Sequence, residues 1–432
     1  MSIGWEAEVA GVVGGAARLP QAADTIPPQM ATRIRSCMES VRAGWWWVIG
    51  AVWAICPGTP ASAQSFASVD DAVRAGISRR VFPGAAVIIG RHDSTLYARG
   101  YGHLTWNASA PAPNVDSTIW DLASLTKVLG PASVAARFVD RGLLELDAPV
   151  ARWIECFRGG EHSRITVRML LDHTSGLMAY RRVGESGDGV RGALRDICSE
   201  RLQSMPGTEV RYSDLNAIVL GALLQQVGGA PLDDLVQREV AEPLGLASLR
   251  FGAPDSTRRR AAPTSRSAGL IVRGAVNDWN AARLQGVAGH AGLFATAADV
   301  ARFARVWLRE GTIDSVRWIS AETARRFLTI TAVTDGRRLG WDVVTAPEKP
   351  SDDPSAFGSL ASSATYGHLG WTGTMLWVDP ARDLFVVFLT NRAYEPRGRR
   401  SLERMREVRT AVSDAVIQAA GPRCVAEAFT PC

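Results

Sequence analysis

The chain has 432 residues, of which 47% are hydrophobic and 21% are charged. This composition is typical of a globular protein and excludes a disordered or collagen-like one, and the length suits one large domain or two lobes. The net charge of +5 is spread over isolated arginines with no long basic run, which argues against a nucleic-acid partner.

The first predicted element is an export signal within residues 1–63. Basic residues between 33 and 42 precede a charge-free stretch at 43–55, and Ala61-Ser62-Ala63 supplies a small-x-small cleavage site. This order is typical of a secretory signal. We expect cleavage after Ala63 and a periplasmic or secreted protein, with contact to the membrane only if the signal stays uncleaved. The stretch is shorter than the roughly 20 residues that a spanning helix needs.

Four cysteines follow the leader: Cys156, Cys198, Cys424 and Cys432. An even number in an oxidising compartment permits disulfides, and four cysteines allow three connectivities. Pairing Cys156 with Cys198 and Cys424 with Cys432 is the most local choice, and free thiols are the alternative. No spacing resembles a zinc site, so no metal or other cofactor is expected.

A β-hairpin is predicted from Phe82 to Gly102, with its turn at residues 92–94. Near Ser124 the pattern becomes helical and continues towards Gly142, a residue type that often ends helices. Pro131 lies inside this stretch and should bend the helix, because proline removes a backbone hydrogen bond.

The middle of the chain is predicted to be mainly helices and loops, whereas strands return towards its end. Thr296 and Asp299 resemble a capping box that opens a further helix. An exposed loop is expected at residues 348–363. The other predicted segments are helices at 216–227 and 232–241, strands at 375–378 and 384–389, and a last helix near 401–420 with an apolar stripe of Leu402, Met405, Val408, Val412 and Val416.

Strands at both ends with helices between them predict an α+β fold. After the extension and signal peptide (1–63), residues 64–432 would form one domain. Its sheet lobe would comprise about 64–122 and 286–432, and a mainly helical lobe, about 123–285, would be inserted between these parts.

Ser124-Leu125-Thr126-Lys127 is the first motif that carries chemistry. Lys127 is one of only two lysines in the chain, so background lysine is rare. Residues at i and i+3 of a helix share one face, where an amine can accept the serine proton and make the hydroxyl a nucleophile. Taken alone, a surface serine and lysine on a helix is the alternative.

Tyr212-Ser213-Asp214 is the second motif, on a loop just before a predicted helix. A tyrosine beside a lysine could act as a phenolate or a proton relay. Asp214 could orient Lys127 or bind a substrate amide. The alternative is a loop-packing aromatic followed by an aspartate that caps the helix.

The third motif is Gly367-His368-Leu369-Gly370-Trp371-Thr372-Gly373-Thr374. Glycines on an edge strand let a substrate backbone approach and pair with the strand. A backbone N–H of this segment could stabilise an oxyanion together with the N–H of Ser124. A glycine-rich turn between strands is the alternative.

In this order the three motifs resemble those of the serine beta-lactamase and penicillin-binding protein superfamily. The likeness is strongest to the branch of class C beta-lactamases, D-Ala-D-Ala carboxypeptidases and esterases. It covers about residues 68–420. Further segments that look like family landmarks are 82–85, 141–150, 170–177, 242–246, 289–294 and 389–392.

The resemblance implies an antiparallel sheet flanked by helices, and a role for each motif residue. Ser124 would be the acylated nucleophile, and Lys127 and Tyr212 would share the general-base work. Asp214, His368 and Gly370 would bind or orient the substrate, with His368 in the place of the third motif's cation. The N–H groups of Ser124 and Trp371 would form the oxyanion hole.

Two departures from the family pattern bear on the substrate. Asp214 stands where asparagine is common, and its negative charge should raise the pKa of Lys127. His368 stands where lysine is common, and a histidine is only partly charged near neutral pH. Both weaken the case for efficient beta-lactam hydrolysis and leave peptidase or esterase activity open.

His173 and His290 also lie in these landmarks, beside glycine and serine. Neither has a partner at metal-ligand spacing, so we interpret both as buried, hydrogen-bonded turn residues rather than metal ligands.

The sequence therefore predicts an exported serine hydrolase that acts through an acyl-enzyme on a peptidoglycan-derived D-amino-acid peptide or a small ester. A class C-type beta-lactamase and a penicillin-binding sensor without turnover are the alternatives.

Overall fold

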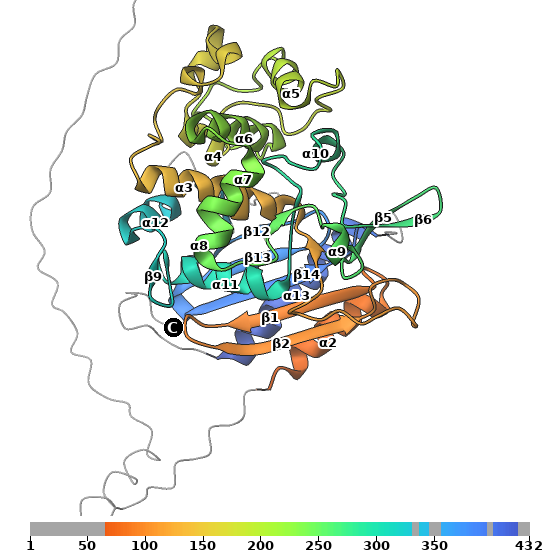
Figure 1. Cartoon of the computed structure of the whole chain (residues 1–432). Helices are drawn as coiled ribbons and strands as arrows, with labels where there is room; N and C mark the ends of the chain where they lie inside the picture. Colours follow the sequence, from red (N-terminus) through yellow and green to blue (C-terminus); the bar gives the residue numbers. More distant parts are fainter. Residues whose placement is uncertain (1–64, 331–336, 345–355, 395–400, 422–432) are drawn as a thin grey trace, which may run out of the picture. The chain divides into compact units, whose positions relative to one another are not determined.

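The apolar run Gly84–Gly90 forms β1, which is buried along its whole length in the middle of an antiparallel sheet. The computed structural model describes residues 65–330, 337–344, 356–394 and 401–421 (Figure 1), so the leader and Cys424 and Cys432 lie outside the described residues. In spatial order the strands are β10 (Arg337–Arg338), β11 (Trp341–Val343), β12 (Tyr366–Leu369), β13 (Met375–Asp379), β14 (Leu384–Thr390), β1 and β2 (Thr95–Gly102).

Helices α2 (Ala67–Ser78) and α13 (Ser401–Ala420) cover one face of this sheet (Figure 1). Alternate residues of β1, such as Val87 and Ile89, pack against them, because successive side chains of a strand point to opposite faces. The predicted bounds of α13 are confirmed. Its predicted apolar stripe is buried except for Leu402, which is 48% exposed.

The other face packs against α11 (Ala297–Leu308), and the same core continues into the helices between β2 and α11. Ile88 of β1 points to this side. The helices are α3 (Ser133–Asp140), α4 (Val167–Leu171), α5 (Gly189–Cys198), α6 (Asp214–Gly228), α7 (Leu232–Val236), α8 (Glu242–Leu244), α9 (Asp255–Arg258), α10 (Trp279–Arg283) and α12 (Ala321–Leu328). Shorter 3₁₀ turns are Ala123–Leu125, Val150–Arg152, Glu155–Phe157, Gly160–Arg164 and Pro380–Arg382, and π-helical turns are Val128–Ala132 and Gln237–Ala241.

The predicted α+β fold, with an antiparallel sheet flanked by helices, is confirmed, and so are the β1–β2 hairpin and the β13–β14 pair. The bend at Pro131 is also present, since Gly130 has non-helical backbone angles there. The short strands of the middle region were not predicted. They are β3 (Trp120–Asp121), β7 (Leu293–Ala295) and β4 (Arg250–Phe251), the pair β5 (Pro263–Ser267) and β6 (Leu270–Arg273), and the pair β8 (Thr312–Ile313) and β9 (Val316–Arg317).

Two helix starts differ in detail from the prediction. Thr296 caps α11 by accepting from the Asp299 N–H, but the Asp299 carboxylate accepts from Ser248 instead of closing the capping box. The cap of α6 is Ser213, whose Oγ accepts from the N–H groups of the next turn, and not Asp214. Asp214 is the first helical residue, and its side chain is thereby available for other contacts.

Part of the predicted exposed loop at 348–363 is buried, since Ala356 and Phe357 pack into the core beside α13. Residues 348–355 of that loop lie outside the described part.

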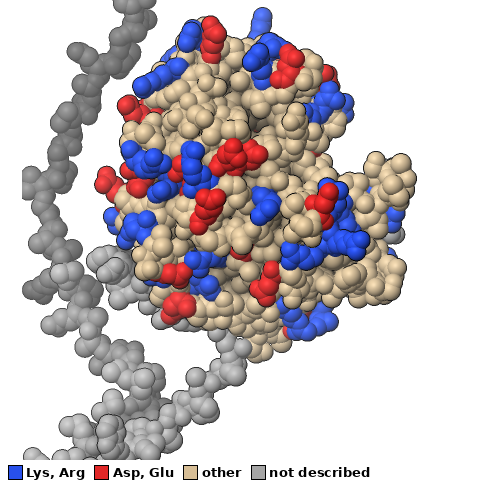
Figure 2. All heavy atoms as spheres, viewed as in Figure 1, with Lys and Arg blue, Asp and Glu red and all other residues tan. Residues whose placement is uncertain are grey.

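Among the described residues, no single helix has the length and hydropathy of a membrane span. Helix α6 together with α7 and α8 has that length and hydropathy only when the two parts are joined across a 79° bend. Charges of both signs are interspersed over the face drawn in Figure 2, in keeping with the absence of a long basic run in the sequence.

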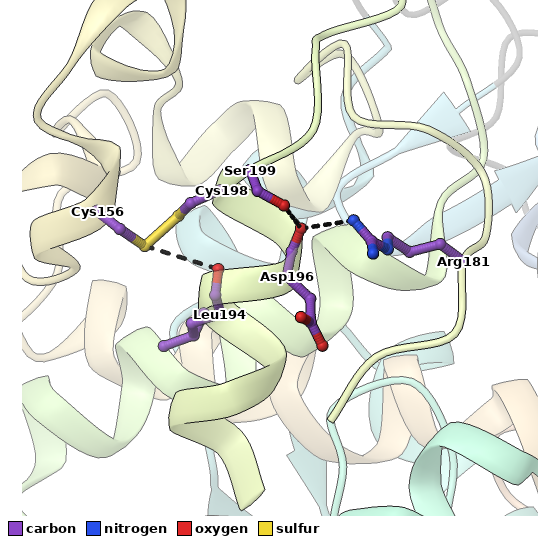
Figure 3. The surroundings of a disulfide bond; sticks show 6 residues. All are labelled: Cys156, Arg181, Leu194, Asp196, Cys198 and Ser199. Carbon is purple, nitrogen blue, oxygen red and sulfur yellow. Dashed lines mark hydrogen bonds between the residues drawn. A yellow bond between two sulfur atoms is a disulfide. The ribbon is translucent and has the colours of Figure 1, made fainter. Parts of the chain in front are cut away.

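A disulfide joins Cys156 to Cys198 across a sequence separation of 42 residues (Figure 3). It ties the 3₁₀ turn Glu155–Phe157 to the last residue of α5. The predicted local pairing is therefore confirmed for these two cysteines. The bond anchors α5, most of whose residues are exposed or half-buried.

We predict that the double variant C156S/C198S unfolds at a lower temperature than the wild type. A closed loop of this length restricts the unfolded chain by about 4 kcal/mol in the chain-entropy model. Thermal unfolding followed by circular dichroism, with and without reductant, measures the effect. Reductant should destabilise the wild type and the C424S/C432S control much more than it destabilises C156S/C198S; equal stability of all three proteins would contradict the prediction.

Candidate active site

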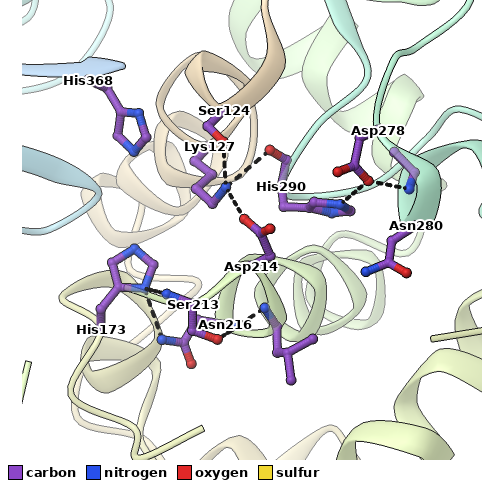
Figure 4. Close-up of polar contacts among 12 residues, drawn as sticks. Ser124, Lys127, His173, Ser213, Asp214, Asn216, Asp278, Asn280, His290 and His368 are labelled. Carbon is purple, nitrogen blue, oxygen red and sulfur yellow. Dashed lines mark hydrogen bonds and ion pairs between the residues drawn. The ribbon is translucent and has the colours of Figure 1, made fainter. Parts of the chain in front are cut away.

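Ser124 and Lys127 lie on the first turns of the bent helix that follows β3, with their side chains together (Figure 4). The Lys127 Nζ donates a hydrogen bond to Ser124 Oγ at 3.1 Å. Ala123 has a φ of +47°, a left-handed conformation that is costly for a residue with a Cβ. The strained residue turns the chain sharply from β3 into the helix and presents Ser124 to the pocket.

The ammonium of Lys127 has an acceptor for each of its three protons. Besides Ser124 it donates to Asp214 Oδ1 at 2.7 Å and to the carbonyl oxygen of His290 at 3.3 Å. Burial is the largest single influence and lowers the pKa of Lys127, but Asp214 and Tyr212 together outweigh it, and the pKa is raised. Lys127 is therefore a cation at neutral pH, as the sequence predicted from Asp214.

Tyr212 projects from the loop before α6, and its ring centroid lies 4.8 Å from Lys127 Nζ. Burial, and after it the Asp214 charge, raises the pKa of this phenol above its usual value; the Lys127 charge and a hydrogen bond with Ser124 offset this only in part. Ser124, Lys127 and Tyr212 thus form one cluster, although Tyr212 is 88 positions away from Ser124 in the sequence.

His173 supports Tyr212 from behind, with 4.9 Å between the ring centroids. Its Nδ1 accepts hydrogen bonds from the Ser213 N–H at 3.2 Å and from the Asn216 amide at 3.0 Å. Burial, with the charges of Arg337 and Lys127, lowers the pKa of His173 well below its usual value. The predicted buried, hydrogen-bonded histidine is found here, and it fixes the Tyr212 loop to the start of α6.

His368 lies on β12 and faces the same pocket (Figure 4). Its Nδ1 is 2.9 Å from the Leu369 carbonyl oxygen. A carbonyl can only accept, so Nδ1 carries the proton and Nε2 presents a lone pair. Burial, together with Lys127 and Arg337, lowers the pKa of His368 to about 4, and the ring is neutral at pH 7.

The segment after His368 is fastened to the nucleophile turn. Thr372 Oγ1 donates to the Asp121 carbonyl oxygen at 2.8 Å, and Thr374 Oγ1 donates to that of Leu122 at 3.0 Å. Gly370, just before them, is required because a Cβ there would overlap Thr374 Oγ1 and lie 2.8 Å from the Leu122 carbonyl oxygen. The backbone of Trp371 is thus held beside Ser124.

The sequence predicted that this motif lies on an edge strand, and that prediction is wrong. β12 pairs with β13 along its whole length and also with β11 at Tyr366 and Gly367. The pairing with β11 ends before His368. The open edge next to the pocket is therefore confined to the last residues of the motif, because β10 and β11 extend the sheet beyond it.

Two carboxylates that the sequence analysis missed lie behind the cluster. Asp121 accepts from the N–H groups of Ala123 and Asn277, and burial raises its pKa to about 6. Asp278 is 2.8 Å from His290 Nε2, and although burial opposes it, this contact lowers the pKa of Asp278. Asp121 was visible in the sequence as a lone acid within the apolar run before Ser124, whereas nothing marked Asp278.

Asp214, Asp278 and His290 have ligand atoms within 4.8 Å of one another, a donor set that could hold a metal ion. The Lys127 ammonium already neutralises Asp214, however, and His290 is hydrogen-bonded to Asp278. Both carboxylates are thus paired, although the buried Nδ1 of His290 has no hydrogen-bond partner among the described residues. The chemistry of the cluster is that of a charged hydrogen-bond network. The sequence had not anticipated that His290 would meet carboxylates.

Around this network lies a cavity of about 970 Å³. Tyr180 and Trp279 line one wall, Trp371 and Leu402 another, and Arg337 of β10 lies among its charged residues. The cavity is large enough for a drug-sized or short peptide ligand.

Comparisons with known proteins agree with this geometry. The model of the family described as Beta-lactamase matches residues 69–410. A protein of Escherichia coli O157:H7 that carries the provisional name D-alanyl-D-alanine carboxypeptidase is 30% identical, over 73% of this chain and 80% of its own. Esterase EstB of Burkholderia gladioli is 32% identical, over 77% of this chain and 92% of its own. A solved beta-lactamase/D-alanine carboxypeptidase of Pseudomonas syringae shares the fold, with a TM-score of 0.65 and 19% identity over 82% of this chain and 99% of its own.

We predict that Asp214→Ala destabilises the protein by about 3 kcal/mol at neutral pH, because it leaves a buried lysine without a counter-charge. In the wild type the raised Lys127 pKa keeps the ion pair intact at every pH below the ordinary lysine value of about 10.4. In the variant burial is opposed by Tyr212 but no longer by Asp214, and the pKa of Lys127 falls. The unfolded state then binds the extra proton, and stability rises with pH.

Urea unfolding at several pH values between about 6 and 10 tests this, read as the difference from wild type at each pH. The deficit should shrink as pH rises. In a D214A/K127M double variant that pH dependence should vanish; a deficit that stays constant in D214A would show that Lys127 is not the group left unpaired.

Proposed function

The chain belongs to the beta-lactamase family, and on that premise we propose that it is an exported serine hydrolase that cleaves an amide or ester through an acyl-enzyme on Ser124. The observation that carries the proposal is the contact of Ser124 Oγ with Lys127 Nζ inside the pocket, with Tyr212 beside both. A hydroxyl held between a cation and a tyrosine oxygen can lose its proton as it attacks a carbonyl when that tyrosine is in its phenolate form.

In the proposed reaction the reacting molecules carry Tyr212 as a phenolate. Ser124 Oγ attacks the substrate carbonyl carbon while its proton passes to this phenolate oxygen. The carbonyl electrons move onto oxygen, which the N–H groups of Ser124 and Trp371 stabilise. Tyr212 then returns the proton to the leaving group as the acyl bond breaks. Water, activated in the same way, hydrolyses the acyl-enzyme.

Lys127 acts in this scheme as a fixed cation rather than a neutral base. Each of its protons has an acceptor, and Asp214 stabilises its charge. The cation favours the negative charge that develops on Ser124 and Tyr212. Asp214 has the role of orienting Lys127, which the contact at 2.7 Å supports.

The neutral state of His368 bears on the substrate. With a pKa of about 4 the ring carries no charge to bind a carboxylate at neutral pH, and its Nε2 can only accept a hydrogen bond. Strong capture of a beta-lactam carboxylate by His368 is therefore not part of the proposal. A neutral small ester is favoured by this argument, in keeping with the esterase name of one relative, and a D-amino-acid peptide is supported by the carboxypeptidase name of another.

Export is the remaining part of the proposal. It is supported by the order of charges, apolar residues and small residues before Ala63. The Cys156–Cys198 disulfide adds support, because such bonds persist in oxidising compartments.

We predict that Ser124→Ala abolishes acylation and lowers ester turnover by at least about 10³-fold, because the nucleophile is lost. Intact-mass kinetics with a chromogenic short-chain ester, a D-Ala-D-Ala peptide and a fluorescent penicillin measure both steps. Exposed Ser78→Ala is the matched control and should behave as wild type.

The same experiment separates the candidate functions. Stable labelling by penicillin without turnover of any substrate would favour a sensor, and rapid turnover of penicillin a beta-lactamase. Full activity in S124A would refute the proposed mechanism.

We predict that the ratio of KM values for an anionic ester and its neutral analogue stays constant between about pH 5.5 and pH 8. A group with its pKa near 4 is deprotonated throughout that window, so His368 gains no charge as the pH falls. Steady-state kinetics with the matched ester pair measures this ratio. An anionic-substrate KM that rises roughly tenfold with a midpoint near pH 6.5 would show that His368 is an ordinary, cationic histidine at the site.

A further inference from the structure

Two cations lie over the ring of Tyr212. Lys127 Nζ is 4.8 Å from the ring centroid, and so is the guanidinium carbon of Arg337. A cation within about 6 Å of an aromatic face is attracted to it, and more strongly when little water intervenes. Lys127 belongs to the motifs described above, whereas Arg337 belongs to none of them.

Arg337 comes from the edge of the sheet. It lies on β10, and in the antiparallel register it is directly opposite Asp342 of β11, so both side chains point to the same face. Their ion pair measures 2.5 Å, and the Arg337 side chain is only 13% exposed. The two short strands thus hold one arginine, with one carboxylate partner, against the pocket wall.

The Arg337 charge also lowers the pKa values of the two histidines next to Tyr212. It contributes, after burial, to the lowered pKa values of His173 and His368. These effects agree with the ring geometry, because both histidine rings also contact Tyr212, with centroid separations of 4.9 and 6.0 Å.

The groups around Tyr212 show why a second charge matters. Lys127 is positive, Asp214 of α6 is negative, and their ion pair leaves little net charge. His173 and His368 are neutral at pH 7. Arg337 is the remaining cation on the ring among the described residues, and Asp342 offsets part of its charge.

We propose that Arg337 is a positioning residue that supplies the second positive charge to Tyr212, so that the tyrosine oxygen can take the Ser124 proton, and that Asp342 moderates this charge. The inference rests on the proposed function and adds how Tyr212 becomes able to act as the base of that reaction. In the attack step Tyr212 reacts as its phenolate: the proton moves from Ser124 Oγ to the Tyr212 oxygen, the Oγ electron pair forms the bond to the acyl carbon, and the carbonyl π electrons move onto the substrate oxygen. The charge that leaves Tyr212 is balanced by the charge that appears on the substrate oxygen.

The test is the pH dependence of the rate at which the chromogenic short-chain ester acylates Ser124. In Arg337→Met the rising limb of this rate–pH profile should move to higher pH by about one unit, with roughly tenfold slower acylation at pH 7. In Asp342→Asn it should move to lower pH, because Arg337 is then unopposed. Arg337→Lys should retain most of the wild-type profile, since it keeps the charge.

Arg338→Met is the matched control. It removes the neighbouring arginine of β10, which lies over Tyr366 and donates to the Ala364 carbonyl oxygen instead. A merely structural role for β10 would make R337M and R338M alike, with lower rates and no shift of the midpoint.

The outcomes separate the inference from the proposed function. If the wild type is acylated at Ser124 and the midpoints of R337M and D342N equal that of the wild type, the role of Arg337 is refuted and the hydrolase mechanism stands. If R337M does not fold, the direction of the D342N shift decides. If the wild type is not acylated at Ser124, the proposed function itself fails.

Discussion

The buried ion pair between Lys127 and Asp214 is the interaction on which the site depends. A lysine ammonium with a side chain 5% exposed would lose its proton or unfold the region without a carboxylate beside it. Asp214 supplies that carboxylate because Ser213, and not Asp214, caps α6. The pair therefore joins the nucleophile helix to α6 and fixes the charge of the amine that touches Ser124.

Hydrogen bonds between separate elements hold the walls of the pocket together. Asp121 ties the turn before Ser124 to Asn277, and Thr372 and Thr374 tie the segment after β12 to that turn. Arg409 of α13 donates to carbonyl oxygens at both ends of this segment. Groups that must act within hydrogen-bonding distance are thus positioned by side-chain contacts from several elements, a rigidity that catalysis requires.

The predictability of each part follows from the range of the forces involved. The β1–β2 hairpin, β13, β14 and α13 were predicted because apolar periodicity and turn residues act locally. The strands β10 and β11 were not, since two or three residues of a strand carry no readable period and form only by pairing with β12. The neutral state of His368 was likewise hidden, because burial and two distant cations set its pKa.

The sequence by itself determined the chemical inventory: a serine and a rare lysine three residues apart, a tyrosine next to an aspartate, and a histidine among glycines. Spacing within one helix turn is enough to place Ser124 beside Lys127. Only the tertiary structure decided that Asp214 holds Lys127 as a cation and that Arg337 meets the ring of Tyr212. Those contacts join residues separated by 87 and 125 positions, and charge and burial act through space and not along the chain.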